Sequence, residues 1–311
     1  MIQVEQYGPV IAIRMARRFL GKPLYWTAAY WVDGLLIDTG PAATARELVH
    51  VLDQVQVRQI VLTHGHEDHI GGLAALRRRH PDVPVYASLR TIDLVKEPQQ
   101  LNMQFYRRVV WGVPAAVDNL IALEEVQDTV RTPRYTLRSV ETPGHTRDHV
   151  SFFEPQQRWV FSGDAFIGGR DHSWAREVDL FSVIGSLQTL AALEPDRLFP
   201  GSGNVRRAPV TELLAKVNYL TEIADDVARL EAGGLSPEAI ADQLFPSDSN
   251  MSFWTQRHFT ALNLVHACRN YNGLFLPSDI LESYPDSAHS AAADATRPSP
   301  KRSTDYGDLI R

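Results

Sequence analysis

The chain has 311 residues, a formal net charge of −6 at pH 7 and one cysteine, Cys268. This length suits one large hydrophobic core with a small added domain. A single cysteine excludes an internal disulfide framework, and the net charge gives no general attraction to nucleic acid or anionic membranes. No apolar run is long enough to cross a bilayer, and residues 1–6 lack a secretion-signal pattern. We therefore expect a cytoplasmic protein without membrane contact.

The first ninety residues predict an alternation of strands and helices. Apolar and β-branched residues bounded by glycine indicate strands, whereas apolar residues at helical spacing indicate helices. The predicted strands are residues 10–14, 28–32, 34–38, 59–63 and 83–87, and the predicted helices are residues 42–52 and 72–80. Such alternation is typical of an α/β fold.

Further strands and two helices are expected up to residue 199. One helix, over residues 104–111, is a candidate to cover a cleft. The strands are predicted at residues 135–140, 149–153, 159–161 and 197–199, and the second helix at residues 186–193.

The pattern becomes helical after Pro209. Five apolar residues step by four, three, four and three, which predicts one face of a helix: Leu213, Val217, Leu220, Ala224 and Val227. A second helix is expected to begin at Ser236-Pro237, and a third is expected over residues 253–270. We predict three parts, namely a catalytic domain (1–208), a helical or winged-helix-like unit (209–285) and a disordered tail (286–311).

Three histidines fall within six residues, in Thr63-His-Gly-His-Glu-Asp-His69. Imidazole and carboxylate groups are common ligands of zinc and similar metals. In an extended segment His64 and His66 point the same way and can bind one ion together, whereas Asp68 and His69 can face a second ion. A solvated, histidine-rich loop is the alternative. The preceding buried strand favours the metal site.

This cluster resembles the signature of the metallo-β-lactamase superfamily, whose fold is a four-layer αββα sandwich. Three further segments resemble that family's motifs in the same order: Asp38-Thr-Gly40, Thr142-Pro-Gly-His145-Thr and Phe161-Ser-Gly-Asp164. The resemblance extends over residues 1–205. It implies an α/β sandwich with a metal centre.

Taken residue by residue, the resemblance assigns His64, His66 and His145 to a first metal ion. Asp68 and His69 would bind a second ion, and Asp164 would bridge the two. His149 is expected near the site, where it either supports a ligand through a hydrogen bond or contacts substrate.

One motif departs from the family pattern. The family places Pro-Gly-His-Gly after the last strand of the sandwich, whereas this chain has Pro200-Gly-Ser202-Gly. A serine hydroxyl is a poor zinc ligand, so we expect a weakened second site. The whole centre should then hold one or two zinc ions. Water is one substitute for the missing ligand, and His172, expected to be an exposed loop residue, is another. Iron or manganese also fits this set of ligands.

These features predict a hydrolase in which metal-bound hydroxide attacks a small ester, thioester, lactone or related substrate. Asp68 is the expected catalytic residue, because its carboxylate can orient water and transfer its proton. The alternatives are an iron-dependent persulfide dioxygenase, an endoribonuclease or phosphodiesterase, and a ligand-binding protein without catalysis.

The helical segment informs the choice of partner. Residues 206–275 contain 6 Lys/Arg and 8 Asp/Glu, without a basic stripe, which argues against a nucleic-acid surface. We expect these helices to cover a small-molecule substrate or to form a homodimer contact.

Overall fold

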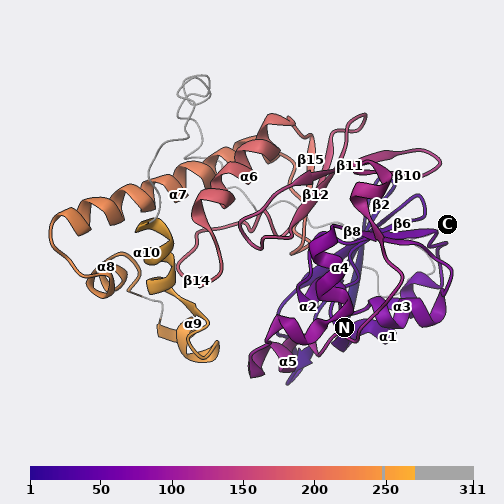
Figure 1. The fold of residues 1–311 in the computed structure, drawn as a ribbon, viewed down its shortest axis with the longest axis horizontal. Coiled ribbons are helices and arrows are strands. Elements are labelled where there is room, and N and C mark those ends of the chain that lie inside the picture. Colours follow the sequence, from indigo (N-terminus) through magenta and orange to yellow (C-terminus); the bar gives the residue numbers. More distant parts are fainter. Residues whose placement is uncertain (247–248, 270–311) are drawn as a thin grey trace.

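Two β-sheets lie face to face between helices in the computed structural model, which describes residues 1–246 and 249–269 (Figure 1). Three apolar clusters separate the layers. One lies between the sheets, and one lies on the outer face of each sheet beneath its helices. The architecture is the expected four-layer α/β sandwich. The predicted tail at residues 286–311 lies outside the described residues.

The first sheet contains seven strands in the order β1-β2-β5-β6-β7-β8-β9. Pairing is antiparallel from β1 to β6 and parallel from β6 to β9. Parallel neighbours need crossover connections, and helices lie in these connections. The strands are β1 Ile2–Tyr7, β2 Val10–Met15, β5 Thr27–Val32, β6 Leu35–Ile37, β7 Gln59–Val61, β8 Val85–Ala87 and β9 Ile121–Ala122.

The second sheet has five strands in the order β10-β11-β12-β13-β15, and only β13 and β15 pair in parallel. Its strands are β10 Thr129–Arg131, β11 Thr136–Glu141, β12 Val150–Glu154, β13 Trp159–Gly163 and β15 Arg197–Pro200. Two small ribbons complete the strands: β3 Arg18–Phe19 with β4 Lys22–Pro23, and β14 Trp174–Ala175 with β16 Phe259–Thr260.

Helices cover both outer faces of the sandwich. The α-helices are α1 Ala45–Leu52, α2 Glu67–Ile70, α3 Leu73–Arg79, α4 Leu89–Lys96, α5 Phe105–Trp111, α6 Leu180–Ala192, α7 Pro209–Ala232, α8 Pro237–Leu244, α9 Ser249–Trp254 and α10 Ala261–Arg269. Three 3₁₀-helices occupy Ala42–Thr44, Pro98–Leu101 and Leu123–Val126. Among the helices described, none combines the length and apolar character that crossing a membrane requires.

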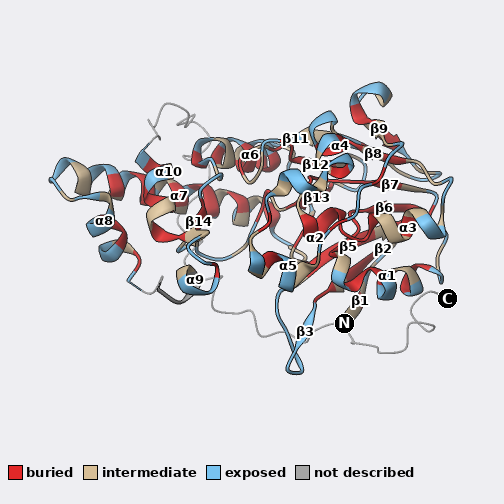
Figure 2. Cartoon of the chain, turned by 60° about the horizontal axis from the view of Figure 1, so that its bottom comes forward, coloured by how far each residue is buried: buried red, intermediate tan, exposed pale blue. Residues whose placement is uncertain are grey.

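Figure 2 shows that buried residues gather along the strands of both sheets. Successive side chains of a strand point alternately into the core between the sheets and into the core beneath the helices. On β2, Ala12 faces the core between the sheets, whereas Ile11 and Ile13 face the core beneath α1 and α3. Between the sheets, Phe161 stacks on Phe199 with ring centroids 4.8 Å apart, and the Tyr30 ring lies 5.4 Å from Phe199. This aromatic group joins β5 of the first sheet to β13 and β15 of the second.

The helix α7 packs against α6 and shares a hydrophobic core with the outer face of the second sheet, whereas α8 and α10 pack against α7 (Figure 1). The predicted face of α7, from Leu213 to Val227, is buried in one cluster with Val160 of β13 and Leu198 of β15. The helix is therefore confirmed. The division at residue 208 stays a prediction, since buried residues before and after it share this core.

The predicted third helix over 253–270 is wrong in its extent. Residues 253–254 belong to α9, and α10 begins only at Ala261. Between them Gln256 and Arg257 have φ of 54° and 62°, a left-handed conformation that ends a helix. The strand β16 then pairs with β14, which is distant in the sequence. Helical periodicity alone does not reveal this pairing.

Truncating the aromatic group between the sheets should destabilise the protein. Phe199 is fully buried, so we expect Phe199→Ala to lower the free energy of unfolding by about 3–5 kcal/mol in urea denaturation. Phe19→Ala is the matched control, because this side chain is 59% exposed and its loss should cost about 0.5 kcal/mol or less. Equal losses in both variants would contradict the assigned core.

Candidate metal centre

The predicted site residues come from strand ends and loops of both sheets. The segment after β7 carries His64 and leads into α2, with His66 at the N-cap. His145 lies between β11 and β12, and Asp164 directly follows β13. Loops at one edge of the sandwich thus bring together residues that are far apart in the sequence.

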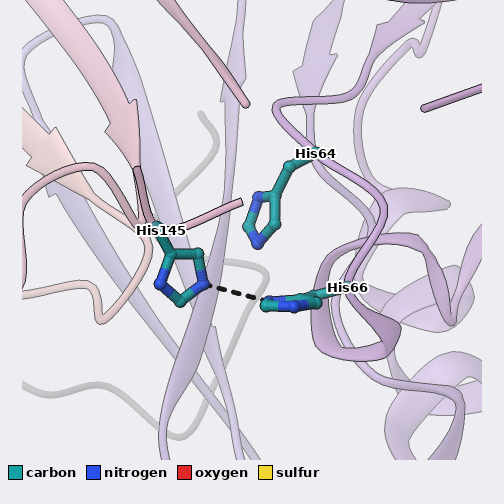
Figure 3. Close-up of side chains that lie close together, drawn as sticks. All are labelled: His64, His66 and His145. Atoms are coloured by element: carbon teal, nitrogen blue, oxygen red, sulfur yellow. Dashed lines mark hydrogen bonds between the residues drawn. The ribbon is translucent and has the colours of Figure 1, made fainter. Parts of the chain in front are cut away.

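The first group consists of His64, His66 and His145, whose ligand atoms all lie within 4.8 Å of one another. Figure 3 shows the three rings converging on one point, with His145 entering from the side opposite His66. The Nε2 atom of His145 lies 3.0 Å from Nδ1 of His66. Three converging imidazoles can hold a divalent metal ion.

The second group consists of His64, His69 and Asp164. One carboxylate oxygen of Asp164 lies 3.4 Å from Nε2 of His69, and the other lies 3.5 Å from Nε2 of His145. Asp68 is adjacent, with its Oδ2 atom 3.9 Å from Nε2 of His69. Asp164 therefore has one oxygen facing each group, as a bridging ligand requires.

Two buried ring nitrogens support metal binding. The Nε2 atoms of His64 and His69 have no hydrogen-bond partner, and both residues are fully buried. An unsatisfied buried polar atom costs about 1–3 kcal/mol, and coordination to a cation would remove that cost. The residues present fit a divalent metal, although they do not identify the element.

Asp38 orients His69. The carboxylate of Asp38 accepts hydrogen bonds from the backbone N–H and the hydroxyl of Thr63, both at 2.8 Å, and lies 2.7 Å from Nδ1 of His69. Nδ1 therefore carries a proton, which leaves Nε2 to face the site. Burial opposes protonation of His69, but without a metal ion the carboxylates of Asp164, Asp38 and Asp68 raise its pKa well above the usual value, so a metal ion at Nε2 would displace a proton.

His149 supports Asp164 from behind. Its Nε2 atom accepts a hydrogen bond from the backbone N–H of Asp164 at 3.0 Å, and its Nδ1 atom lies 2.9 Å from the hydroxyl of Thr142. Burial lowers the pKa of His149 to about 3, so the ring is neutral. Since both nitrogens are occupied, His149 holds the loop that carries Asp164. The alternative expectation, contact with substrate, is not favoured.

Asp68 lies beside the second group, and Tyr25 comes two residues before Thr27, the hydrogen-bond partner of Asp68. The hydroxyl of Thr27 donates a hydrogen bond to Asp68 at 3.0 Å, and burial raises the pKa of Asp68 to about 6. Burial, together with the carboxylates of Asp164 and Asp68, also raises the pKa of Tyr25.

The end of β15 passes directly over the second group. A side chain at Gly201 would place its Cβ atom 2.1 Å from Oδ1 of Asp164 and 2.9 Å from Cε1 of His69, so only glycine fits there. Ser202 comes next, where the family pattern has histidine. His172 is exposed, with its ring 6.3 Å from that of Phe245 in the helical unit. Within residues 1–246 and 249–269, neither convergent group of histidines and carboxylates includes His172.

Two buried acidic residues inside the motifs were missed as site residues. Glu67 forms two hydrogen bonds of 2.6 Å with Arg107 and thereby joins α2 to α5. Asp148 accepts hydrogen bonds from the backbone N–H of Gly65 at 2.7 Å and from the hydroxyl of Thr91 at 2.8 Å. Each carboxylate stands beside a histidine in the sequence, which is the only signal. Their partners are 40 to 83 residues away.

The family model of the metallo-beta-lactamase superfamily matches residues 27–202, more than half of the chain. The chain belongs to this superfamily. It is 30% identical over 193 residues to a beta-lactamase-like protein 2 homolog of Drosophila melanogaster, a match that covers 60% of each chain. It is also 30% identical over 174 residues to the thioesterase pkgB of Emericella nidulans, which covers 55% of this chain and 42% of the relative.

The fold itself is shared with solved members of the superfamily. A beta-lactamase domain protein from Burkholderia ambifaria has a TM-score of 0.64 with 19% identity, and the match covers 84% of this chain and 87% of that structure. By contrast, the chain spans only about 60% or less of the length of the two relatives above.

Restoring the family ligand should change the metal content. We expect the natively purified protein to hold clearly fewer than two metal equivalents, and Ser202→His to raise this number in elemental analysis, because imidazole completes the second group. Ser202→Asn enlarges the same side chain without adding an imidazole and should leave the content unchanged. Two tightly held equivalents in the unaltered protein would instead show that another ligand replaces the histidine.

Removing the acceptor that orients His69 should weaken metal binding. We expect Asp38→Asn to lower metal affinity about 10- to 100-fold in competition with a chromophoric chelator. Asp33→Asn is the control. Like Asp38, Asp33 has a positive φ, but its carboxylate binds Arg134 and Thr132 on the surface. If both variants retain full affinity, the hydrogen bond from Asp38 does not prepare the site.

Proposed function

We propose that the protein is a metal-dependent hydrolase of small thioesters or related acyl substrates. The observation that carries this proposal is the placement of Asp164, whose two oxygens face His69 and His145 at 3.4 and 3.5 Å. Two adjacent ligand groups that share a carboxylate suit the binding and cleavage of an acyl bond.

Zinc, or iron or manganese in its place, is the proposed cofactor. His64, His66 and His145 would hold the first ion, and His69, Asp68 and Asp164 would contribute to a weaker second position. A divalent ion bound here would supply hydroxide at neutral pH and would polarise the carbonyl oxygen of a substrate.

Asp68 is the proposed proton carrier. Thr27 donates a hydrogen bond to one of its oxygens, which fixes the orientation of the carboxylate beside His69. In its ionised form Asp68 can accept a proton from the attacking water and return it to the leaving thiolate or alkoxide. His149 and Asp38 contribute by holding Asp164 and His69 in place.

The thioester is favoured among acyl substrates because of one relative's name, a thioesterase, at 30% identity. A nucleic-acid substrate is disfavoured, since residues 206–275 carry more acidic than basic side chains. The substrate is therefore proposed to be a small molecule.

Metal removal tests this proposal. Chelation should lower hydrolysis of S-acetyl-N-acetylcysteamine at least about 100-fold, and added zinc, manganese or iron should restore it. His145→Ala should lose both the activity and metal at the first position, whereas His50→Ala, at an exposed position on α1, should retain both.

Other outcomes would identify the competing functions. Bound iron with thiol-dependent oxygen uptake and no hydrolysis would establish an oxidoreductase. A metal-loaded protein that binds acyl compounds but hydrolyses no ester, thioester, lactone or phosphodiester would be a binding protein.

A further inference from the structure

A hydrogen-bonded chain outside the metal centre joins three separate segments. The hydroxyl of Tyr106 on α5 lies 2.7 Å from Nδ1 of His258, which precedes β16. Nε2 of the same imidazole lies 3.0 Å from the carboxylate of Glu177. The three residues are separated by 152 and 81 positions in the sequence, so the chain exists only in the folded protein.

The chemistry of the three groups fixes the direction of both hydrogen bonds. A carboxylate only accepts, so Nε2 of His258 carries the proton and donates to Glu177. The hydrogen bond from His258 lowers the pKa of Glu177, which keeps this carboxyl ionised. In the tautomer with its proton on Nε2, Nδ1 of His258 accepts from the hydroxyl of Tyr106, whose pKa burial raises to about 12. This donation occupies the phenol proton, which makes Tyr106 a poor candidate for a general acid.

The first end of this chain is attached to the metal motif. Arg107, the next residue on α5, forms the buried ion pair with Glu67, which lies between His66 and Asp68. Tyr106 therefore sits on a helix whose position is already tied to the ligand segment. Figures 1 and 2 both show α5 beside α9, the helix that leads to His258.

The other end is attached to the loop that follows Asp164. Glu177 lies two residues after β14, which pairs with β16, and Asn263 of α10 donates a hydrogen bond to the backbone carbonyl of Trp174 at 3.0 Å. Farther back in the same loop, Lys216 of α7 binds Asp171 at 2.7 Å. The C-terminal helices thus hold the loop of the bridging ligand at two places.

Between these ends, aromatic rings continue from Tyr106 toward the metal centre. The ring of Tyr106 lies 6.3 Å from that of Trp111, which in turn lies 5.7 Å from the ring of Tyr25. Tyr25 comes two residues before Thr27, whose hydroxyl donates a hydrogen bond to Asp68. We call Tyr25, Trp111 and Tyr106 the aromatic wall.

We propose that His258 is a positioning residue of the site. It holds α5 against the C-terminal segment and the loop behind Asp164, so that the aromatic wall stays in place to receive the acyl group of the substrate. The role in acyl binding rests on the proposed hydrolase function, whereas the positioning of α5 does not.

Two substitutions of His258 separate its hydrogen bond with Tyr106 from its hydrogen bond with Glu177. An Asn side chain can place its oxygen near the position of Nδ1, and a Gln side chain can place its amide near Nε2. We expect His258→Asn to keep the acceptor for Tyr106, and His258→Gln to keep only the donor to Glu177. Amide hydrogen exchange of residues 105–111 and 252–260 should therefore rise in Tyr106→Phe and His258→Gln, and stay near wild type in His258→Asn.

Kinetics with two thioesters of the same thiol test the acyl role. In Tyr106→Phe, KM for S-decanoyl-N-acetylcysteamine should rise about three- to tenfold, the effect of losing one partly buried hydrogen bond, with kcat changed by about twofold or less. KM for the S-acetyl compound should change less, because a short chain does not extend along the wall. Bound metal should stay unchanged.

Tyr219→Phe is the matched control, since it removes another tyrosine hydrogen bond, to the backbone carbonyl of Asp171 in the same loop. It should leave exchange in residues 105–111 unaltered. Unchanged exchange in Tyr106→Phe would overturn the positioning role. Faster exchange with KM unchanged for both thioesters would overturn the role in acyl binding. If the unaltered protein cleaves neither compound, the proposed function fails, and the exchange result alone decides the positioning role.

Discussion

The edge of the sandwich that carries the candidate metal ligands is held closed by hydrogen bonds between the sheets, two of which come from β5. The backbone N–H of Ala28 in β5 donates to the carbonyl of Gly201 at 2.6 Å, and the hydroxyl of Tyr30 donates to the carbonyl of Pro200 at 2.5 Å. Because these bonds hold the end of β15 against the first sheet, ligands from β7 and β13 meet at atomic distances. The arrangement of the centre depends on this closure and on the aromatic packing beneath it.

The residues of the centre differ in how readily they can be predicted from the sequence. His64 and His66 were predicted as ligands of one ion from their spacing alone, and the resemblance to the superfamily added His145 and Asp164 to the prediction. Arg107 and Asp148 were not found, because a lone charged residue carries no sign of a partner 40 or more positions away. The chain through His258 was missed for the same reason.

Prediction of the fold from the sequence has the same limit, because contacts between distant residues leave no local signal. Alternation and helical spacing predicted most of the sandwich, since burial on one face is a local property of the sequence. They placed a single helix over residues 253–270, where a break and a short strand occur, because β16 depends on pairing with β14. At that point the structure is determined by long-range strand pairing rather than by local helix propensity. His258, which contacts α5, directly precedes this strand.

The core shared by α6, α7, β13 and β15 has a consequence for how the protein can vary. Val160 and Leu198 on the second sheet share one buried cluster with residues of α6 and with Leu213, Val217 and Leu220 of α7. A shortened chain that ended near residue 208 would expose this apolar surface to water and would be prone to aggregation. Insertions and deletions should therefore be tolerated at the turn around Gly234, beyond α7, far better than at the junction where the helices begin. The predicted boundary at residue 208 therefore falls within a shared hydrophobic core rather than in an exposed linker.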